Sequence, residues 1–378
     1  MLRRRKSGEH EFPPQLATSF IKLGARGAET RHRDMILRLR KLGFRVDVSV
    51  CDLRSESLGR SLRRYIPLFL NKFAAGVVAS ISGRHVKTFF AFESYSFIGG
   101  AIVARPLKRE AVYFCRNDQI YEKATINSIC RSNLSVPFHL YILQYFCLLL
   151  CDRYVVQSCF AAAHIERRFK SWPFTKAAAK IKVLENDLRI SLHRIPDVSG
   201  LRRTRVGFIA NPEWEKKGFF ILKDLLSSEA FKSTDLSFTI VGRGDAFDRL
   251  RDEIGALPKE RVRFHGFCDD IAELRELVDL VFVPSIVDHF PNVLIECAAL
   301  GLPMLLSNIE AHRNILPNHP SYFDLGIAPQ QMMDALLSLT DPATWKETAE
   351  LQQRDIVRLK NAWQEPLKEI FQANAQVK

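Results

Sequence analysis

Short apolar runs typical of β-strands alternate with segments of helical periodicity from one end of the sequence to the other. The predicted strands are 16–23, 44–50, 86–92, 111–115, 153–158 and 181–186 in the first half, and 204–210, 236–242, 261–266, 280–285 and 303–307 in the second. Strands that are apolar nearly throughout are typical of parallel sheets covered by helices on both faces. The pattern therefore predicts an α/β chain with doubly wound sheets.

The chain is too long for one core. It has 378 residues, whereas single hydrophobic cores stop growing at roughly 250 to 300 residues. Polar and turn-forming residues interrupt the pattern at 191–203, which predicts the boundary between two domains there. A long amphipathic stretch at 345–371 closes the pattern.

Positive charge is concentrated in the first half of the chain. The net charge is +13, made up of +18 over residues 1–200 and −5 over residues 201–378. A basic half is compatible with nucleic acid, an anionic membrane or an anionic substrate. In the basic stretch 60–73, cations alternate with bulky apolar residues; this favours shallow membrane contact over nucleic-acid binding, and a solvated face is nearly as compatible.

The longest apolar segment is 136–151, "VPFHLYILQYFCLLLC". Its uninterrupted part is shorter than the roughly 20 residues of a membrane span, so we expect a core helix ahead of an interfacial one. The eight cysteines form no C-x-x-C pair and indicate reduced thiols of a cytoplasmic protein. The basic N-terminus lacks a following apolar region, so no secretory signal is expected.

A series of motifs in the second half resembles a known family. In order they are "WEKKGF", "FTIVGRGD", "VRFHGF", "LVFVPS", "DHFPNVLIECAALGLPMLLSN", "HRNIL" and "YFD". The series resembles the C-terminal domain of the family 4 glycosyltransferases over roughly 120 residues. The first half is similar more weakly, through "GARGAETRHRDMILRLRKLGFRVDVSV" and "IKVLENDL".

The resemblance implies the GT-B fold, in which two Rossmann-like domains face each other across a cleft. Residues 1–197 would bind the acceptor, residues 198–345 would bind a nucleotide-sugar donor, and a C-terminal helix in 346–378 would pack back on the first domain. The implied activity is retaining transfer of a sugar from a nucleotide-diphosphate sugar to a hydroxyl of a glycan or glycolipid, in cell-surface polysaccharide synthesis. We expect a cytoplasmic protein, in peripheral contact with the inner face of the membrane.

The family signature Glu-x7-Glu reads Asp288-x7-Glu296 here. The resemblance implies that Glu296 holds the donor ribose, that Asp288 stands beside the donor sugar, and that the amides of Phe290, Pro291, Asn292 and Val293 line the sugar and diphosphate. Pro291 is well tolerated as the first residue of a helix, so a helix from about Asn292 would direct free N–H groups at a phosphate. Pro291 itself can offer no N–H.

The remaining donor-binding residues that the resemblance implies lie in three other segments. Lys217 fits the family lysine that binds the diphosphate, whereas the usual arginine is missing near Asn211. Lys216 or Arg243 would supply the missing charge, unless the diphosphate is held with one cation fewer. Gly242 stands at a strand-ending turn that faces the cleft, and Phe267 ends the motif "VRFHGF".

Candidate residues in the first half follow strands or open a helix. Gly24 and Gly27 stand between the first strand and a helix, where a backbone can approach a ligand closely. Asp118 in "CRNDQ" lies at the carboxyl edge of the sheet, where α/β sheets bind ligands, and is the candidate catalytic residue of this half. Glu93 and Ser94 in "FESYS" lie equivalently, and each of these turns is equally compatible with a structural role.

No metal or other cofactor is predicted, because the sequence has neither Asp-x-Asp nor a His/Cys cluster at zinc spacing. The expected partners are the nucleotide-sugar donor and a glycan or lipid-linked acceptor, and no nucleic acid. Two alternatives remain open at this point. The chain could be an inactive glycosyltransferase-like subunit, given Asp288 and the missing arginine, or a nucleic-acid-binding protein that uses its basic half.

Overall fold

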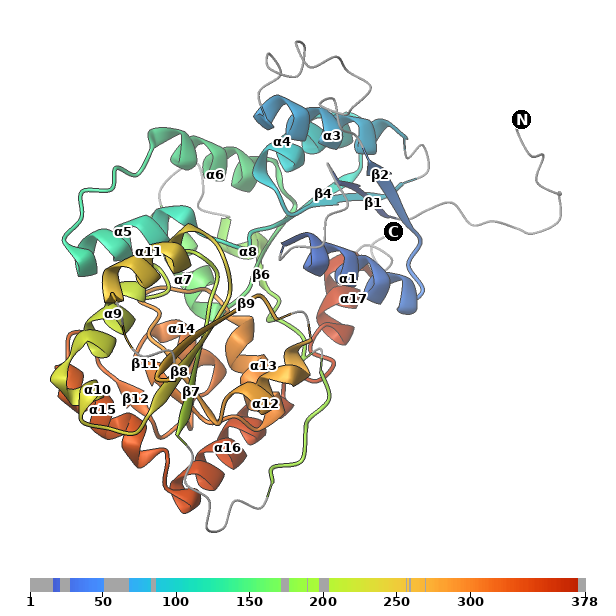
Figure 1. The fold of residues 1–378 in the computed structure, drawn as a ribbon. Helices are drawn as coiled ribbons and strands as arrows, with labels where there is room; N and C mark the ends of the chain where they lie inside the picture. The colour runs from blue at the N-terminus through green and yellow to red at the C-terminus, as the bar shows by residue number, and fades with distance from the viewer. Residues whose placement is uncertain are drawn as a thin grey trace, which may run out of the picture.

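Two parallel six-stranded sheets, one in each half of the chain, form the frame of the fold (Figure 1). The computed structural model describes residues 16–20, 28–50, 68–82, 86–170, 177–188, 190–196, 204–255, 257, 260–268 and 270–372. Both sheets are doubly wound, because each strand order reverses direction inside the sheet. The predicted α/β class with two doubly wound domains is confirmed.

The first sheet has the order β2-β1-β3-β4-β5-β6, with every pair parallel. Its strands are β1 (Leu16–Phe20), β2 (Val46–Val50), β3 (Thr88–Ala91), β4 (Glu110–Phe114), β5 (Arg153–Val156) and β6 (Ile181–Val183). The helices of this domain are α1 (Ala28–Lys41), α3 (Leu68–Ser82), α4 (Ser94–Ala104), α5 (Gln119–Cys130), α6 (Phe138–Leu150), α7 (Cys159–Arg168) and α8 (Ala177–Lys180). Separate apolar cores cover the two faces, one around Phe90 and Phe114 and the other around Phe97 and Tyr154.

The second sheet has the order β12-β11-β10-β7-β8-β9, again with every pair parallel. Its strands are β7 (Arg205–Ile209), β8 (Ser237–Val241), β9 (Val262–Gly266), β10 (Leu280–Val283), β11 (Met304–Ser307) and β12 (Tyr322–Phe323). The helices are α9 (Phe219–Ser227), α10 (Glu229–Lys232), α11 (Asp245–Ile254), the 3-10 turn η1 (Ile271–Glu273), α12 (Leu274–Leu277), α13 (Asn292–Leu300), α14 (Glu310–Ile315), α15 (Pro329–Ser338), α16 (Pro342–Val357) and α17 (Gln364–Gln372). The short β12 has no counterpart among the predicted strands.

The amphipathic C-terminal stretch is divided into α16 and α17 rather than continuous. Asn361, between the two helices, has a positive φ of 62°, a backbone conformation that asparagine tolerates better than most residues. Helix α16 packs against α13 of the second domain, whereas α17 lies beside α1 of the first domain (Figure 1). Trp363 and Phe371 join the core around Phe90, so the chain crosses back between the domains at this turn.

The expectation of a core helix at 136–151 is wrong for one face of α6. Cys147 and Leu148 are buried, but Phe138 is 76% exposed, and Phe146 and Leu149 are also exposed. Helix α6 therefore lies on the surface of the first domain with one apolar face uncovered by the described residues. Within those residues, no helix is both long enough and apolar enough to cross a membrane.

Candidate functional site

Two loops of the second domain meet at the carboxyl ends of the paired strands β7 and β10. The Ile286 N–H donates to the carbonyl of Lys216 at 3.0 Å and ties the loops together. Gly218 has a φ of +69°, and a Cβ atom there would lie 2.0 Å from the carbonyl oxygen of Pro284. Only glycine permits this approach, which explains why Lys217 is followed by a glycine.

Lys217 and Asp288, one from each loop, form a nearly buried ion pair. The Lys217 Nζ lies 2.5 Å from Asp288 Oδ2, and the His289 N–H donates to Asp288 Oδ1 at 2.8 Å. Burial alone would raise the pKa of Asp288, but Lys217, Lys216 and the His289 amide hold that pKa well below its ordinary value. Asp288 is therefore an anion that the lysine already neutralises.

Helix α13 begins at Asn292, as the sequence predicts. Pro291 is its N-cap residue, with φ −68° and ψ 121°, rather than its first helical residue. A proline side chain accepts no hydrogen bond, so it leaves the first N–H groups of the helix to other partners. Asn186 Nδ2 donates to the carbonyl of Phe290 at 3.1 Å and to Asn292 Oδ1 at 3.0 Å. Glu296 is half-buried one turn into the same helix.

The turn after β8 places Gly242 and Arg243 at the same sheet edge. The Gly242 N–H donates to the Gly266 carbonyl at 2.6 Å. At a φ of +141°, a Cβ atom on Gly242 would lie 2.2 Å from the Phe247 ring, so this position also requires glycine. The Arg243 guanidinium lies over the exposed Phe267 ring, 5.2 Å from its centroid. This pair forms an exposed part of the edge, whereas the Lys217–Asp288 pair is nearly buried.

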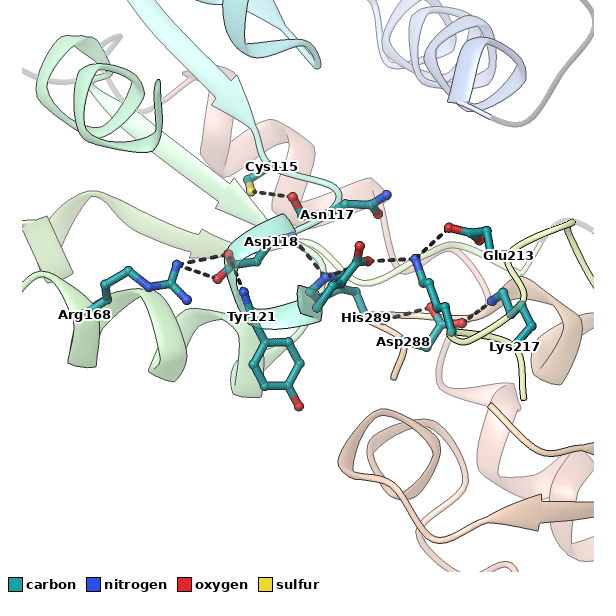
Figure 2. A network of polar contacts seen from close by, with 11 residues as sticks. Cys115, Asn117, Asp118, Tyr121, Arg168, Glu213, Lys217, Asp288 and His289 are labelled. Carbon is teal, nitrogen blue, oxygen red and sulfur yellow. Dashed lines mark hydrogen bonds and ion pairs between the residues drawn. The ribbon is translucent and has the colours of Figure 1, made fainter. Parts of the chain in front are cut away.

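His289 carries the second-domain loop into the first domain (Figure 2). Its Nε2 accepts the Asp118 N–H at 3.0 Å, and its ring is parallel to that of Phe160 with 6.3 Å between centroids. Glu122 Oε1 lies 3.2 Å from the same nitrogen and receives a hydrogen bond from Lys216 Nζ at 2.7 Å. The backbone proton makes Nε2 an acceptor, so a neutral imidazole would carry its proton on Nδ1.

Lys216 is the central cation of this network. It is buried between Glu122 of the first domain and Glu213 of its own loop, at 2.7 and 3.5 Å. Burial would lower the pKa of Lys216, but Glu122, Asp288 and Glu213 together raise it above its ordinary value. The ammonium group is therefore retained although it is almost inaccessible to water.

The carboxylate of Asp118 is held by groups of its own domain. It accepts the Tyr121 N–H at 3.2 Å, which caps helix α5, and its oxygens lie 2.9 and 2.8 Å from Arg168 Nη1 (Figure 2). Arg168 also donates to Gln144 Oε1 at 2.6 Å. The part of Asp118 that faces the second domain is therefore its backbone N–H rather than its side chain.

A cavity of about 620 Å³ opens at the carboxyl ends of β3 and β4. Its wall combines the "FESYS" and "CRNDQ" turns with residues of α3 and α6, and it includes Lys72, Glu93, Ser94, Tyr95, Arg116, Asn117, Asp118, His139, Leu143 and Gln144. Lys72 forms an ion pair with Glu93, and the Arg116 guanidinium lies over the Phe92 ring at 4.5 Å. The two turns singled out in the sequence thus share one cavity, and Asp118 links it to the loop of His289.

Several residues of the candidate site could not be predicted from the sequence. Glu122 lies within helix α5 without any motif around it, and His289 stands inside the signature at a position to which the resemblance gives no role. His312 is fully buried and donates from Nδ1 to the Ser307 carbonyl at 2.9 Å. Its Nε2 has no hydrogen-bond partner among the described residues, and burial lowers the pKa of His312 to about 4.

Two expectations concern segments outside the described residues. Gly24 and Gly27 lie in 21–27, and most of the basic stretch 60–73 lies in 51–67. Within the described residues, no group of three or more His, Cys, Asp or Glu side chains is arranged to hold a metal ion.

Comparison with known sequences gives one family match, which lies in the second domain, and several relatives. Residues 203–341 match the family described as Glycosyl transferases group 1. A phosphatidyl-myo-inositol mannosyltransferase of Mycobacterium leprae is 30% identical over 162 residues, which are 41% of this chain and 42% of the relative. The protein of the same name from Mycobacterium tuberculosis is 31% identical over 112 residues, 29% of each chain. The matched part therefore spans less than half the length of these relatives.

Solved structures match over nearly the whole chain. HepE of Anabaena, in complex with UDP-glucose, has a TM-score of 0.68 at 17% identity and covers 94% of this chain and 99% of its own. Sucrose-phosphate synthase of Thermosynechococcus elongatus has a TM-score of 0.72 at 16% identity, with 96% and 99% covered. WaaG, a glycosyltransferase of lipopolysaccharide biosynthesis, has a TM-score of 0.64 at 15% identity, with 94% and 99% covered. At these identities the matches establish the two-domain GT-B fold.

Proposed function

We propose that this chain, whose residues 203–341 match the group 1 glycosyltransferases and whose fold is GT-B, transfers a sugar from a nucleotide-diphosphate sugar to a hydroxyl group of a glycan or glycolipid. One observation carries this proposal. The loop with the family signature touches the wall of the first-domain cavity where the Asp118 N–H donates to His289 Nε2 at 3.0 Å. A donor at the loop and an acceptor in the cavity would therefore be neighbours, as a direct transfer requires.

The donor diphosphate would bind where positive charge is concentrated. Lys216 and Lys217 stand together before α9, and the first N–H groups of α13 add a positive helix end. Lys216 takes the place of the missing family arginine in this proposal, because it stands next to Lys217 in the same loop and its raised pKa keeps it charged; the diphosphate would replace its contact with Glu122 at 2.7 Å. Glu296 would hold the ribose and Asp288 a sugar hydroxyl.

We propose retention of configuration, by a front-face displacement in which the departing phosphate oxygen takes the proton of the acceptor hydroxyl. The two lysines and the helix end would stabilise the charge that develops on the diphosphate, without a metal ion in that role. The Asp118 carboxylate would position rather than react, since Arg168 and the α5 cap occupy it.

The acceptor is proposed to be lipid-linked. The named mycobacterial relatives act on phosphatidyl-myo-inositol, and the cavity offers paired charges and aromatic hydroxyls suited to a polyhydroxylated head group. A role in cell-surface glycan or glycolipid synthesis, at the inner face of the cytoplasmic membrane, would follow from such an acceptor.

Donor binding tests the proposal most directly. In a thermal-shift panel of UDP-, GDP-, ADP- and dTDP-sugars, one nucleotide should raise the melting temperature, since a ligand at a hundred times its Kd stabilises by about 2.7 kcal/mol. Slow hydrolysis of the same donor should disappear in Glu296→Ala and Lys217→Ala. Glu347→Ala and Lys346→Ala, which remove matched exposed charges on α16, should keep it.

The outcomes separate the alternatives. Binding of a nucleotide-sugar without hydrolysis or transfer, under any acceptor supplied, would identify an inactive glycosyltransferase-like subunit. No binding of any nucleotide-sugar, together with salt-sensitive binding of DNA or RNA, would favour the nucleic-acid alternative and contradict the proposal.

A further inference from the structure

Helix α6 presents an apolar face that the described residues leave open. Phe138, Tyr141, Ile142, Phe146 and Leu149 are 39 to 76% exposed. The steps between them are three, one, four and three residues, which puts all five on one side of the helix. Large apolar side chains gathered on one surface helix are uncommon unless the surface binds something.

Exposed apolar side chains also stand on or beside the elements next to α6. Helix α4 packs against both α3 and α6, and the three lie along one side of the first domain (Figure 1). Exposed apolar residues on or beside these elements are Phe69, Leu70, Val78, Ile81, Ile102, Leu107, Ile129 and Leu134. Among the described residues, all exposed large apolar side chains except Leu37, Leu192, Phe267 and Val357 belong to this set or to α6. We call the two groups together the apolar surface.

Cations stand at the C-terminal end of α6. At its C-terminus, Arg105 donates to the carbonyls of Leu149 and Leu150 at 3.1 and 3.2 Å, and Lys180 Nζ donates to the carbonyl of Cys151 at 2.8 Å. Arg105 is exposed. These bonds complement the negative end of the helix and fix the cations beside the apolar surface.

Two further exposed cations stand in tight turns around the apolar surface. Lys108 lies in the turn after α4 and Arg131 at the end of α5, with φ of 54° and 49°. Asn127 holds the loop after Arg131 against α5 through the N–H and the carbonyl of Leu134, at 2.8 and 2.7 Å. The loop therefore presents Leu134 and Arg131 in a fixed arrangement.

The acidic groups of this part of the domain are largely engaged elsewhere. Glu93 pairs with Lys72, Glu110 with Arg153, Asp118 with Arg168 and Glu122 with Lys216. At the C-terminal end of α6, the exposed Asp152 stands beside the two cations Arg105 and Lys180, and one of its oxygens accepts the Ala111 N–H at 2.8 Å. An apolar surface bordered by cations complements an anionic lipid leaflet, with its negative head groups outside an apolar layer.

We propose that the apolar surface docks on an anionic lipid bilayer, with α6 lying in the plane of the interface. Another side of α6 contributes His139, Leu140 and Leu143 to the wall of the first-domain cavity. A bilayer at the apolar surface would therefore lie beside the cavity, and a lipid-linked acceptor could place its head group there without leaving the membrane. This placement rests on the proposed function, whereas docking itself does not.

A second copy of the chain fits this surface less well. A two-fold dimer through the apolar surface would set its cationic border against the same border of the partner copy, because a two-fold interface uses one patch on both subunits. Like charges brought together at an interface oppose association. The charge pattern therefore favours lipid as the occupant.

Vesicle flotation of the full chain tests the docking. We expect binding to phosphatidylcholine vesicles that contain phosphatidylglycerol, weaker binding at high salt, and little binding to phosphatidylcholine alone. Phe138→Ser/Phe146→Ser should lower the partition coefficient at least about tenfold. The matched control Leu37→Ser/Val357→Ser, which removes exposed apolar side chains from α1 and α16, should bind as the native chain does.

Two more measurements complete the test. The tryptophan fluorescence of Phe138→Trp should shift to the blue with these vesicles and be quenched by brominated lipid. This measurement does not need a variant with weakened binding. Light scattering should give the same mass for the native chain and the double serine variant. The proposal would be overturned if the native chain did not bind vesicles, or if the control variant lost as much vesicle binding as the double serine variant. It would also be overturned if the native chain were a dimer that the double serine variant dissociates. The nucleotide-sugar panel is independent of all these results, so a failure of docking and a failure of the proposed function are distinguishable.

Discussion

Lys216 Nζ lies 2.7 Å from Glu122 Oε1, so a cation beside the signature loop of the second domain is neutralised by a carboxylate of the first. Around this contact, Ile126 of α5 packs against Ile286 and Val287 of the second domain. A donor diphosphate at Lys216 would have to compete with Glu122 for the same ammonium group. In the proposed donor complex, the contact between the domains would therefore be coupled to donor binding.

Replacing Glu122 with glutamine should strengthen binding of a nucleoside diphosphate. The amide keeps a hydrogen-bond acceptor for Lys216 but removes the competing charge, and we expect a decrease in Kd of roughly fivefold, measured by calorimetry. Glu310→Gln is the matched control, because Glu310 Oε2 also faces the first domain, 3.8 Å from His164 Nε2, without touching Lys216. Unchanged or weaker binding in Glu122→Gln would contradict the competition.

Separating Lys217 from Asp288 should destabilise the second domain. Lys217→Met leaves Asp288 buried without its cation, which should lower the free energy of unfolding by about 3 kcal/mol. Asp288→Asn alone should lower the unfolding free energy by less, because it leaves a lysine that can still reach water. In the double variant the two decreases in unfolding free energy should not add, since no unpaired buried charge remains.

Urea unfolding of the native chain, both single variants and the double variant measures this coupling. The exposed pair of Lys232 and Glu229, 2.7 Å apart, provides the control cycle, and its removal should change stability by less than about 1 kcal/mol. Additive losses for Lys217 and Asp288 would show that the pair is not coupled.

Much of the fold is predictable from local pattern. Strands such as 236–242 and 280–285 are apolar nearly throughout because helices cover both faces of the sheet, and this burial is visible in the sequence. Helix α13 begins where Pro291 permits it. The short β12 has too few residues to give a pattern. The division between α16 and α17 depends on how the two domains sit together, which no local window contains.

The candidate site is predictable on the side that carries a motif. Lys217 and Asp288 belong to recognisable turns, and the structure places them 2.5 Å apart. The roles of His289 and Glu122 arise from contacts between the domains, made by residues that lie 171 and 94 positions apart in the chain, so the sequence near either residue does not reveal its role. The exposure of α6 could not be predicted for a related reason. The sequence of an apolar helix does not show whether its apolar face packs against the same protein or against something else.

Replacing Asp118 with asparagine should separate a structural from a chemical role. Asparagine caps helices as well as aspartate does and keeps the N–H that reaches His289. It removes the negative charge opposite Arg168, so the free energy of unfolding should fall by about 1 to 3 kcal/mol. Sugar transfer should stay within roughly threefold of the native rate when assayed well below the melting temperature.

The opposite result would restore Asp118 as a catalytic carboxylate. A loss of transfer of more than about a hundredfold, with unchanged donor affinity and an intact fold, would be of the size expected for a lost acid or base. Circular dichroism and the nucleotide thermal shift provide the two controls on the same sample.

Two buried histidines should make the second domain sensitive to mild acid. Burial lowers the pKa of both His312 and His319 to about 4, whereas an unfolded histidine titrates near 6.5. The unfolded state therefore binds protons first as the pH falls, so their contribution is complete above about pH 6.5 and is lost progressively toward pH 4. Between pH 7 and pH 5, each histidine should cost about 2 kcal/mol of unfolding free energy.

Urea unfolding at these two pH values measures the decrease in unfolding free energy. In His312→Gln this decrease should be smaller by about the contribution of one histidine. Ser307→Ala is the matched control, because it keeps the backbone carbonyl that accepts the His312 Nδ1–H at 2.9 Å and keeps the titrating ring. That variant should be less stable at both pH values and retain the full pH dependence. The same pH dependence in His312→Gln as in the native chain would mean that His312 does not stay neutral in the folded protein, and its unpartnered Nε2 would then have to find an acceptor on protonation.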